Sequence, residues 1–224
     1  MRSLSKEKYT EKDLVDNFFY NSLPYRLFKK NTIALEEPNL PIGFPDIVLC
    51  TLQDDFREVI SREYLLDYRQ LKLLHYIYLS KGVNLDTIER KLLFSNSFVN
   101  NNIDGFLSNG LVKLDGNTVR LNPLGEIFAI DRIVAVEAKL TNWKKVLDQA
   151  NRNRWFASES YILMPSKINF KKVMKESRKK GIGILTSGHD SNHILLKSDK
   201  SNIPKSYGSW IINEMLIKKL QENV

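Results

Sequence analysis

The last third of the chain alternates apolar runs with amphipathic segments, and no other feature constrains the fold as strongly. Strands are predicted at residues 132–139, 161–164 and 182–185, and helices at 142–157 and 170–180 between them. Strands that are joined by helices pair in parallel, because the helix carries the chain back to the edge from which the next strand starts. The sequence therefore predicts an α/β protein whose sheet contains parallel strands.

The N-terminal part is predicted to contribute one helix and two strands to the same sheet. Thr10 is a good N-cap with Asp13 three residues later, and it precedes apolar residues at helical spacing. Residues 32–35 and 47–49 are short apolar runs separated by a segment rich in proline, and they are predicted to be strands.

Between these two parts lies a segment with a different pattern. Three helices are predicted at residues 68–80, 85–93 and 97–108, followed by a hairpin at 111–121 whose turn contains Asp115-Gly116. Three helices followed by a hairpin is the order of a winged helix, a helix-turn-helix variant that mostly binds DNA but also binds protein. The sequence therefore predicts an inserted winged-helix domain at 62–127, between core segments 1–61 and 128–224.

Composition excludes several classes of protein. No apolar run approaches the roughly 20 residues that span a bilayer, and the first residues lack the apolar core of a signal peptide, so we expect a cytoplasmic protein without a membrane partner. The single Cys50 cannot form an internal disulfide or supply a cysteine zinc cluster.

The net charge is +8, and the excess of basic residues lies near the C-terminus. Residues 128–224 hold 18 Lys and Arg against 9 Asp and Glu. A basic surface attracts polyanions, so DNA is the expected partner, although a solvated helix face is an alternative explanation. The candidate nucleic-acid contacts are the basic residues of the 142–157 helix and one arginine of the predicted wing: Lys144, Lys145, Arg152, Arg154 and Arg120.

One acidic residue and one Glu-x-Lys triplet carry the predicted chemistry. Asp46 stands at the entrance of a strand, and Glu137 and Lys139 point to the same face of another, because alternate residues of a strand share a face. Two carboxylates suit Mg²⁺ or Mn²⁺ and leave coordination positions for water and phosphate. The second such triplet, Glu89-Arg90-Lys91, lies in a predicted helix, where residues two apart do not face each other. Taken alone, Asp46 could equally be a turn residue.

Residues 43–48, with the sequence Gly-Phe-Pro-Asp-Ile-Val, together with Val136-Glu137-Ala138-Lys139, resemble the motifs of the PD-(D/E)XK nuclease superfamily. This resemblance implies the restriction-endonuclease-like fold, an α/β core with a mixed sheet flanked by helices. Residues 10–15 are similar to the first helix of archaeal Holliday-junction resolvases, which implies a metal-site role for Glu11. Residues 143–150 resemble the helix after Glu-x-Lys, which implies that Gln149 lies near the active site. Without the resemblance, Glu11 could simply complement the helix dipole, and Gln149 could be an ordinary helical residue.

The chain departs from the family pattern in the 91 positions that separate Asp46 from Glu137, and the inserted domain accounts for the excess. The resemblance implies a Mg²⁺-dependent endodeoxyribonuclease in which Asp46, Glu137 and Glu11 bind the metal and Lys139 positions the attacking water. Two alternatives stay open: a non-catalytic DNA-binding regulator that keeps the fold, or a subunit that cuts only with a partner. A homodimer, or a partner protein from a mobile-element or defence system, would fit such an enzyme.

Overall fold

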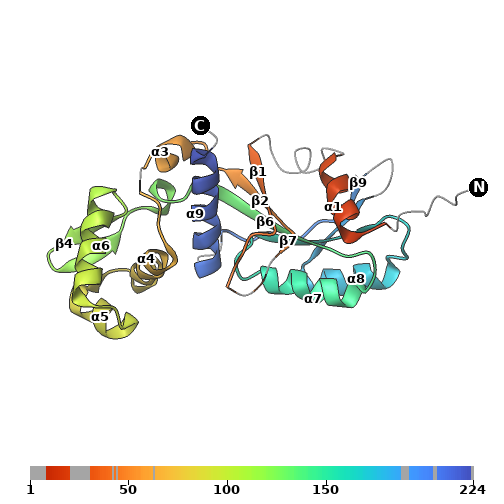
Figure 1. The fold of residues 1–224 in the computed structure, drawn as a ribbon. Coiled ribbons are helices and arrows are strands. Elements are labelled where there is room, and N and C mark those ends of the chain that lie inside the picture. Colours follow the sequence, from red (N-terminus) through yellow and green to blue (C-terminus); the bar gives the residue numbers. More distant parts are fainter. Residues whose placement is uncertain are drawn as a thin grey trace, which may run out of the picture. The chain divides into compact units, whose positions relative to one another are not determined.

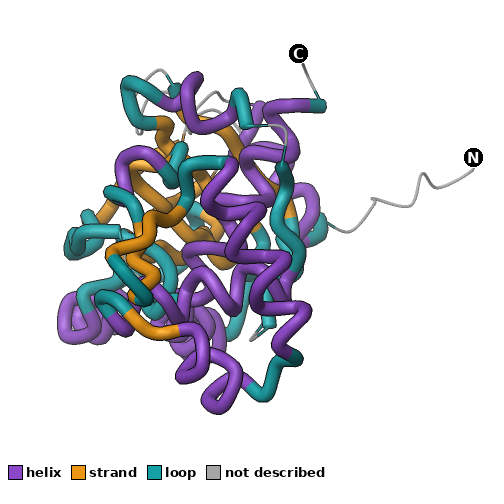
Figure 2. The backbone as a smooth tube through the Cα atoms, turned by 90° about the vertical axis from the view of Figure 1, so that its left-hand side faces the viewer, coloured by secondary structure: helices purple, strands orange, loops and turns teal. Residues whose placement is uncertain are grey.

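The computed structural model describes residues 9–20, 31–41, 43, 45–62, 64–187, 192–203 and 206–222. The described residues form two compact units, and each is considered by itself. The first unit comprises Met1–Thr51 and Arg132–Pro204, and the second comprises Leu52–Asp131 and Lys205–Val224. Helices and strands occur in both units (Figures 1 and 2). No helix in the described ranges has both the length and the apolar character needed to cross a membrane.

The first unit is built on a six-stranded mixed sheet with the order β1-β2-β6-β7-β8-β9. The central strands β6, β7 and β8 pair in parallel, whereas β1 pairs with β2 and β8 with β9 in antiparallel fashion. The α/β class and the mixed sheet flanked by helices are therefore confirmed. The strands are β1 (Thr32–Glu36), β2 (Ile47–Leu52), β6 (Ile130–Ala138), β7 (Glu159–Pro165), β8 (Gly183–Ser187) and β9 (Asn192–Leu196).

Three helices cover the two faces of this sheet (Figure 1). Leu14 and Phe18 of α1 (Glu11–Tyr20) are fully buried against one face, together with Val134 and Val136 of β6. On the other face, apolar residues of α7 (Trp143–Asn153) and α8 (Lys171–Lys180) pack against Ile162 of β7. Burial of apolar side chains on both faces explains why the central strands read as nearly continuous apolar runs.

The start of α1 follows the predicted cap. The Thr10 backbone N–H and hydroxyl both donate to Asp13 Oδ2, at 2.6 and 2.7 Å, and the Asp13 N–H donates back to the Thr10 hydroxyl at 3.2 Å. This reciprocal arrangement satisfies backbone donors that the first helical turn leaves unpaired. The cap thereby fixes the position of Glu11, the first residue of the helix.

In the second unit the helices at Tyr68–Ser80, Leu85–Leu92 and Asn96–Ser108 are followed by a hairpin, as the sequence predicts, and helices at Phe56–Ile60 and Tyr207–Gln221 also belong to this unit. The hairpin turns at Gly116, whose φ of 58° is a left-handed conformation that glycine adopts readily. The elements are α3 (Phe56–Ile60), α4 (Tyr68–Ser80), β3 (Val83–Asn84), α5 (Leu85–Leu92), α6 (Asn96–Ser108), β4 (Val112–Asp115), β5 (Thr118–Leu121), the 3₁₀ turn η1 (Leu124–Glu126) and α9 (Tyr207–Gln221).

The limits of the two units differ from the segments expected at 1–61, 62–127 and 128–224. Residues 52–61 and the terminal helix α9 belong to the second unit rather than to the core. The Trp210 ring lies 4.9 Å from the Phe128 ring, and Glu214 forms a buried ion pair with Arg62. The helix α9 buries residues around most of its circumference, so its sequence shows no single apolar face that would indicate what it packs against.

Candidate functional site

Glu137 lies near the end of β6 and points to the face of the sheet that α7 covers. Its neighbours Val136 and Ala138 pack on the α1 side, so the alternation of the strand turns Glu137 to the opposite side. The side chain is only 4% exposed, and Asn153 at the end of α7 donates a hydrogen bond from Nδ2 to Glu137 Oε1 at 2.7 Å. Glu137 is therefore a buried carboxylate with one defined donor.

Asp46 lies beside Glu137 because β2 and β6 are neighbours in the sheet. Asp46 Oδ2 accepts the backbone N–H of Ala138 at 2.6 Å, which ties the residue before β2 to the end of β6. Asp46 and Glu137 are 91 positions apart in the sequence and lie at the same end of two adjacent strands.

Burial dominates the electrostatics of this carboxylate pair. Burial raises the pKa of Glu137 to about 7, against the opposing effect of the Asn153 hydrogen bond, and the nearby Asp46 raises that pKa further. Burial also raises the pKa of Asp46, and the Ala138 N–H opposes the change. Because Asp46 disfavours the ionised form of Glu137, a cation between the two carboxylates would stabilise that form.

Lys139 and Glu11 form an ion pair with each other, joining the end of β6 to the start of α1. Glu11 also raises the pKa of Asp46, so its charge acts on the site. Among the described residues, however, no three His, Cys, Asp or Glu side chains are grouped as ligands for a metal ion. Glu11 thus lies close to the predicted site, but the structure engages it with Lys139.

Gln149 lies one helical turn before Asn153 on α7. The Gln149 side-chain oxygen is buried and has no hydrogen-bond partner among the described residues. A buried amide oxygen without a donor carries a substantial free-energy penalty, so such an atom usually marks a place for water, an ion or a substrate. Sequence reasoning missed Asn153, although its position four residues after Gln149 was an available signal.

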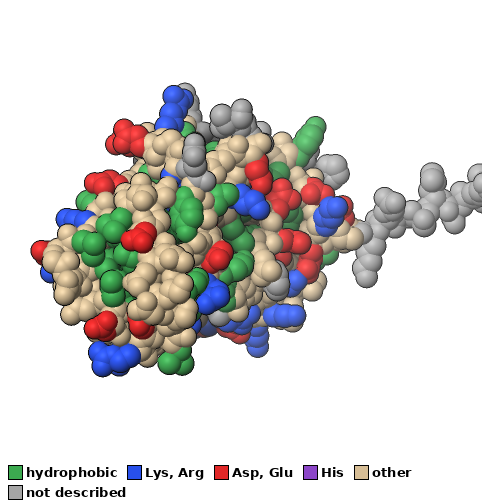
Figure 3. All heavy atoms as spheres, turned by 60° about the vertical axis from the view of Figure 1, so that its left-hand side comes forward, with side chains coloured by type: hydrophobic (Ala, Val, Ile, Leu, Met, Phe, Trp, Pro, Cys, Tyr) green, Lys and Arg blue, Asp and Glu red, His purple; other side chains and the backbone are tan. Residues whose placement is uncertain are grey.

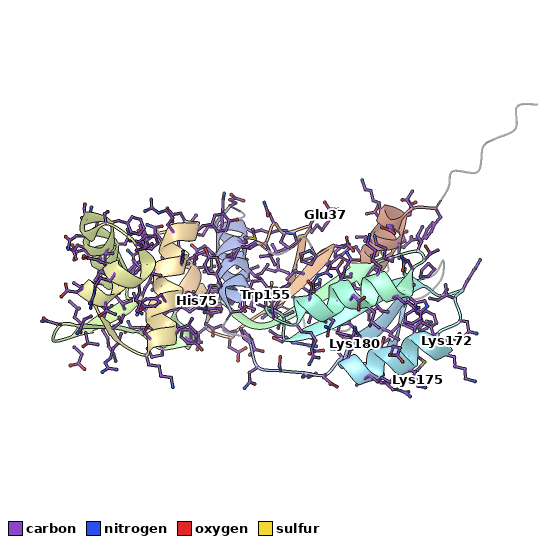
Figure 4. All side chains as sticks on the ribbon, turned by 90° about the horizontal axis from the view of Figure 1, so that it is seen from below. Glu37, His75, Trp155, Lys172, Lys175 and Lys180 are labelled. Atoms are coloured by element: carbon purple, nitrogen blue, oxygen red, sulfur yellow. The ribbon has the colours of Figure 1, made fainter. Side chains whose placement is uncertain are left out.

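A cavity of about 420 Å³ opens next to Asp46, and acidic side chains dominate its lining. Glu37 is one of them and is labelled in Figure 4. Because the cavity carries more acidic than basic groups, a bare phosphate would be repelled from it in the absence of a cation. The residues that line the cavity are Glu11, Lys12, Val15, Asp16, Glu36, Glu37, Asp46 and Ala138.

The residues predicted to contact nucleic acid differ in whether their side chains already make contacts within the protein. Lys144, Lys145 and Arg152 are exposed on α7, and the charge of Arg152 acts on Glu137. Arg154 instead donates from Nη1 to the Lys180 carbonyl oxygen at 2.5 Å. Arg120, in the second unit, donates to the Lys81 carbonyl oxygen at 2.9 Å and pairs with Asp115 at 3.4 Å. These two arginines therefore have structural contacts of their own.

The two units differ sharply in charge. The first unit contains 22 Lys and Arg against 13 Asp and Glu, whereas the second contains 12 against 13. Figure 3 shows one face of the molecule, on which hydrophobic side chains are scattered among charged ones. Among the described residues of the second unit, the exposed large hydrophobic side chains are Leu65, Tyr68, Leu79, Leu93 and Leu114.

Comparison with known proteins yields no relative: no family model matches the chain, and neither the curated proteins nor the solved structures contain a significant match.

Proposed function

We propose that the chain is a metal-dependent endodeoxyribonuclease of the PD-(D/E)XK superfamily, which hydrolyses phosphodiester bonds in DNA. The observation that carries the proposal is the buried Glu137 beside Asp46 at the ends of two adjacent strands, with Lys139 two residues further along. Burying two neighbouring carboxylates costs free energy, and one of the two, Asp46, lines a cavity, so the pair favours a catalytic role.

The arrangement of the first unit supports a restriction-endonuclease-like core. A mixed sheet with α1 on one face and α7 and α8 on the other carries both motifs of the resemblance on adjacent strands. The three helices and the hairpin of the second unit support an inserted winged helix. Because the second unit is nearly neutral, we assign most of the attraction for DNA to the first unit, and we assign an assisting contact to the winged helix.

The residues present fit a Mg²⁺ or Mn²⁺ ion. Asp46 and Glu137 would hold it, since each has a pKa raised by burial and Asp46 raises that of Glu137. The unpartnered Gln149 oxygen, one helical turn before Asn153 on α7, would add a neutral oxygen ligand, and Glu11 would serve as an auxiliary ligand. Two carboxylates are a usual protein contribution to a magnesium site that acts on phosphates. When bound, the ion supplies charge stabilisation of the phosphate and lowers the pKa of a coordinated water.

The side chains around the pair have separate tasks in this proposal. Asn153 holds the Glu137 carboxylate in one orientation through its hydrogen bond. The Ala138 N–H does the same for Asp46. Lys139 orients the attacking water or neutralises charge on the phosphate once Glu11 releases it.

A second candidate is a DNA-binding regulator, or a subunit that cuts only with a partner. The ion pair between Lys139 and Glu11 favours it, because the pair engages the lysine that catalysis would need. The two candidates make different predictions for the purified chain: the enzyme cuts DNA alone, and the regulator binds DNA without cutting.

The decisive experiment incubates purified protein with supercoiled, linear and branched DNA in Mg²⁺ or Mn²⁺, with EDTA as a control. We expect metal-dependent cutting that Glu137→Gln and Lys139→Ala each reduce by at least about 100-fold, in line with removal of a group that stabilises the transition state. The matched controls are Glu89→Gln and Lys91→Ala, which alter the same triplet on helix α5 and should keep full activity. Undiminished cutting by both site variants would refute the mechanism.

A further inference from the structure

A groove runs between α7 and α8, on the face of the sheet opposite α1, and the proposed chemistry does not use it. Its volume is about 700 Å³. Figure 4 shows the two helices side by side, with Lys172, Lys175 and Lys180 labelled on α8. The remaining lining residues are Trp143, Lys144, Leu147 and Asp148 of α7 and Glu176 of α8.

The groove carries positive charge that the protein itself leaves unneutralised. Lys180 pairs with Asp148 at 3.0 Å, and Glu176 pairs with Lys179 at 2.9 Å, so both acidic side chains already have partners. Lys144, Lys172 and Lys175 form no ion pair in the described part of the chain. Three lysines around one groove therefore attract a ligand with several negative charges.

An aromatic ring lies beside these charges. The Trp143 ring is half-buried at the start of α7, and Lys144 Nζ lies 5.8 Å from its centroid. A lysine row next to a partly open indole ring is the combination that binds single-stranded nucleic acids, in which phosphates meet cations and bases stack on aromatic side chains. An acidic peptide would satisfy the lysines but would leave the planar ring without a matching surface.

The indole ring selects the form of the nucleic acid. A base can stack on an aromatic side chain when it is not already stacked inside a duplex, so Trp143 favours a single strand. We propose that the α7–α8 groove binds single-stranded nucleic acid, with Lys144, Lys172 and Lys175 on its phosphates and Trp143 stacked on a base. As a statement about the substrate, this inference rests on the proposed nuclease function, whereas the binding itself requires neither metal nor cutting.

The test measures binding of a fluorescein-labelled 20-nucleotide oligo-dT to the full chain in EDTA, by fluorescence anisotropy, beside a duplex of the same length. We expect Lys172→Ala with Lys175→Ala to weaken single-strand binding at least about 10-fold and to reduce the log–log salt slope by about 1.4, the value for two lost phosphate contacts. The control pair is Lys171→Ala with Arg178→Ala, which removes the same charge from the same helix outside the groove and should change the affinity less than about 2-fold.

The indole ring gives a second readout. Trp143→Leu should weaken binding at least about 5-fold, and Trp143→Phe should recover most of that loss because a ring is restored. Equal weakening by the groove pair and the control pair would overturn the proposal, as would unchanged binding in the Trp143→Leu variant. Competition by polyglutamate as strong as that by unlabelled oligo-dT would also overturn it and would identify a site for acidic peptides. If the unaltered chain binds oligo-dT but cuts no plasmid, the proposed nuclease function is refuted while the proposed binding site in the groove is supported.

Discussion

Replacing Glu137 by Gln should stabilise the metal-free protein at neutral and alkaline pH. Burial raises the pKa of Glu137 from its usual 4.5 to about 7, so between these values the folded chain holds a proton that the unfolded chain has lost. The free energy of unfolding therefore falls as the pH rises through this window. The raised pKa of Glu137 lowers the free energy of unfolding by about 3 kcal/mol above pH 7 and leaves it unchanged below pH 4.5. A Gln side chain keeps an oxygen for the Asn153 donor and carries no charge.

The assay is urea denaturation in EDTA at pH 5 and pH 8, followed by tryptophan fluorescence. Trp143 and Trp155 lie in the first unit and Trp210 in the second, so a Trp210→Phe background makes the signal report on the first unit. We expect Glu137→Gln to be more stable than the parent by about 3 kcal/mol at pH 8 and by a small fraction of that at pH 5. Glu89→Gln, on α5, is the matched control and should show no such dependence. A stability difference that is the same at both pH values would refute the electrostatic reasoning.

Two further predictions concern the hydrogen bonds that hold the site and the second unit. Asn153→Ala removes the donor that lowers the pKa of Glu137, so the acidic limb of the pH profile for DNA cutting should move to higher pH, which initial rates between pH 5 and 9 would show. Glu214→Ala leaves the Arg62 guanidinium buried without its partner and removes the acceptor of the Leu66 N–H, so the second unit should lose about 3–5 kcal/mol of stability, measured by denaturation with Trp210 as the probe.

Most of the elements could be predicted from the sequence because their signals are local. The helix Tyr68–Ser80 and the strand Thr118–Leu121 match the predicted ranges, and a cap or a turn residue defines their ends. The strand Asn192–Leu196 was missed because it is an edge strand, whose apolar stretch is short and is preceded by polar residues. The packing of α9 could not be predicted at all, since it depends on contacts such as that between Trp210 and Phe128, which are far apart in the chain.

In the candidate site, too, local features could be predicted from the sequence and long-range contacts could not. Strand alternation alone puts Glu137 on the face opposite Val136, and the adjacency of β2 and β6 brings Asp46 to it. The ion pair between Lys139 and Glu11 depends on how α1 crosses the end of the sheet, which no local pattern specifies. The unpartnered oxygen of Gln149 likewise emerges only when the burial of that one atom is known.

Within the first unit, the basic surface that would attract DNA and the acidic cavity that would cut it lie at different places. Acidic side chains surround the cavity at Asp46, whereas Lys144, Lys172 and Lys175 surround the groove between α7 and α8. The electrostatic potential therefore attracts a polyanion to the helices and repels it from the carboxylates. A cation bound by Asp46 and Glu137 would make the potential at the carboxylates favourable. If the proposed function is correct, binding to the helices proceeds without metal while entry of a phosphate into the cavity requires it. Asp46, which catalysis would use, thus also belongs to the acidic lining that keeps DNA out of the cavity until the metal is present.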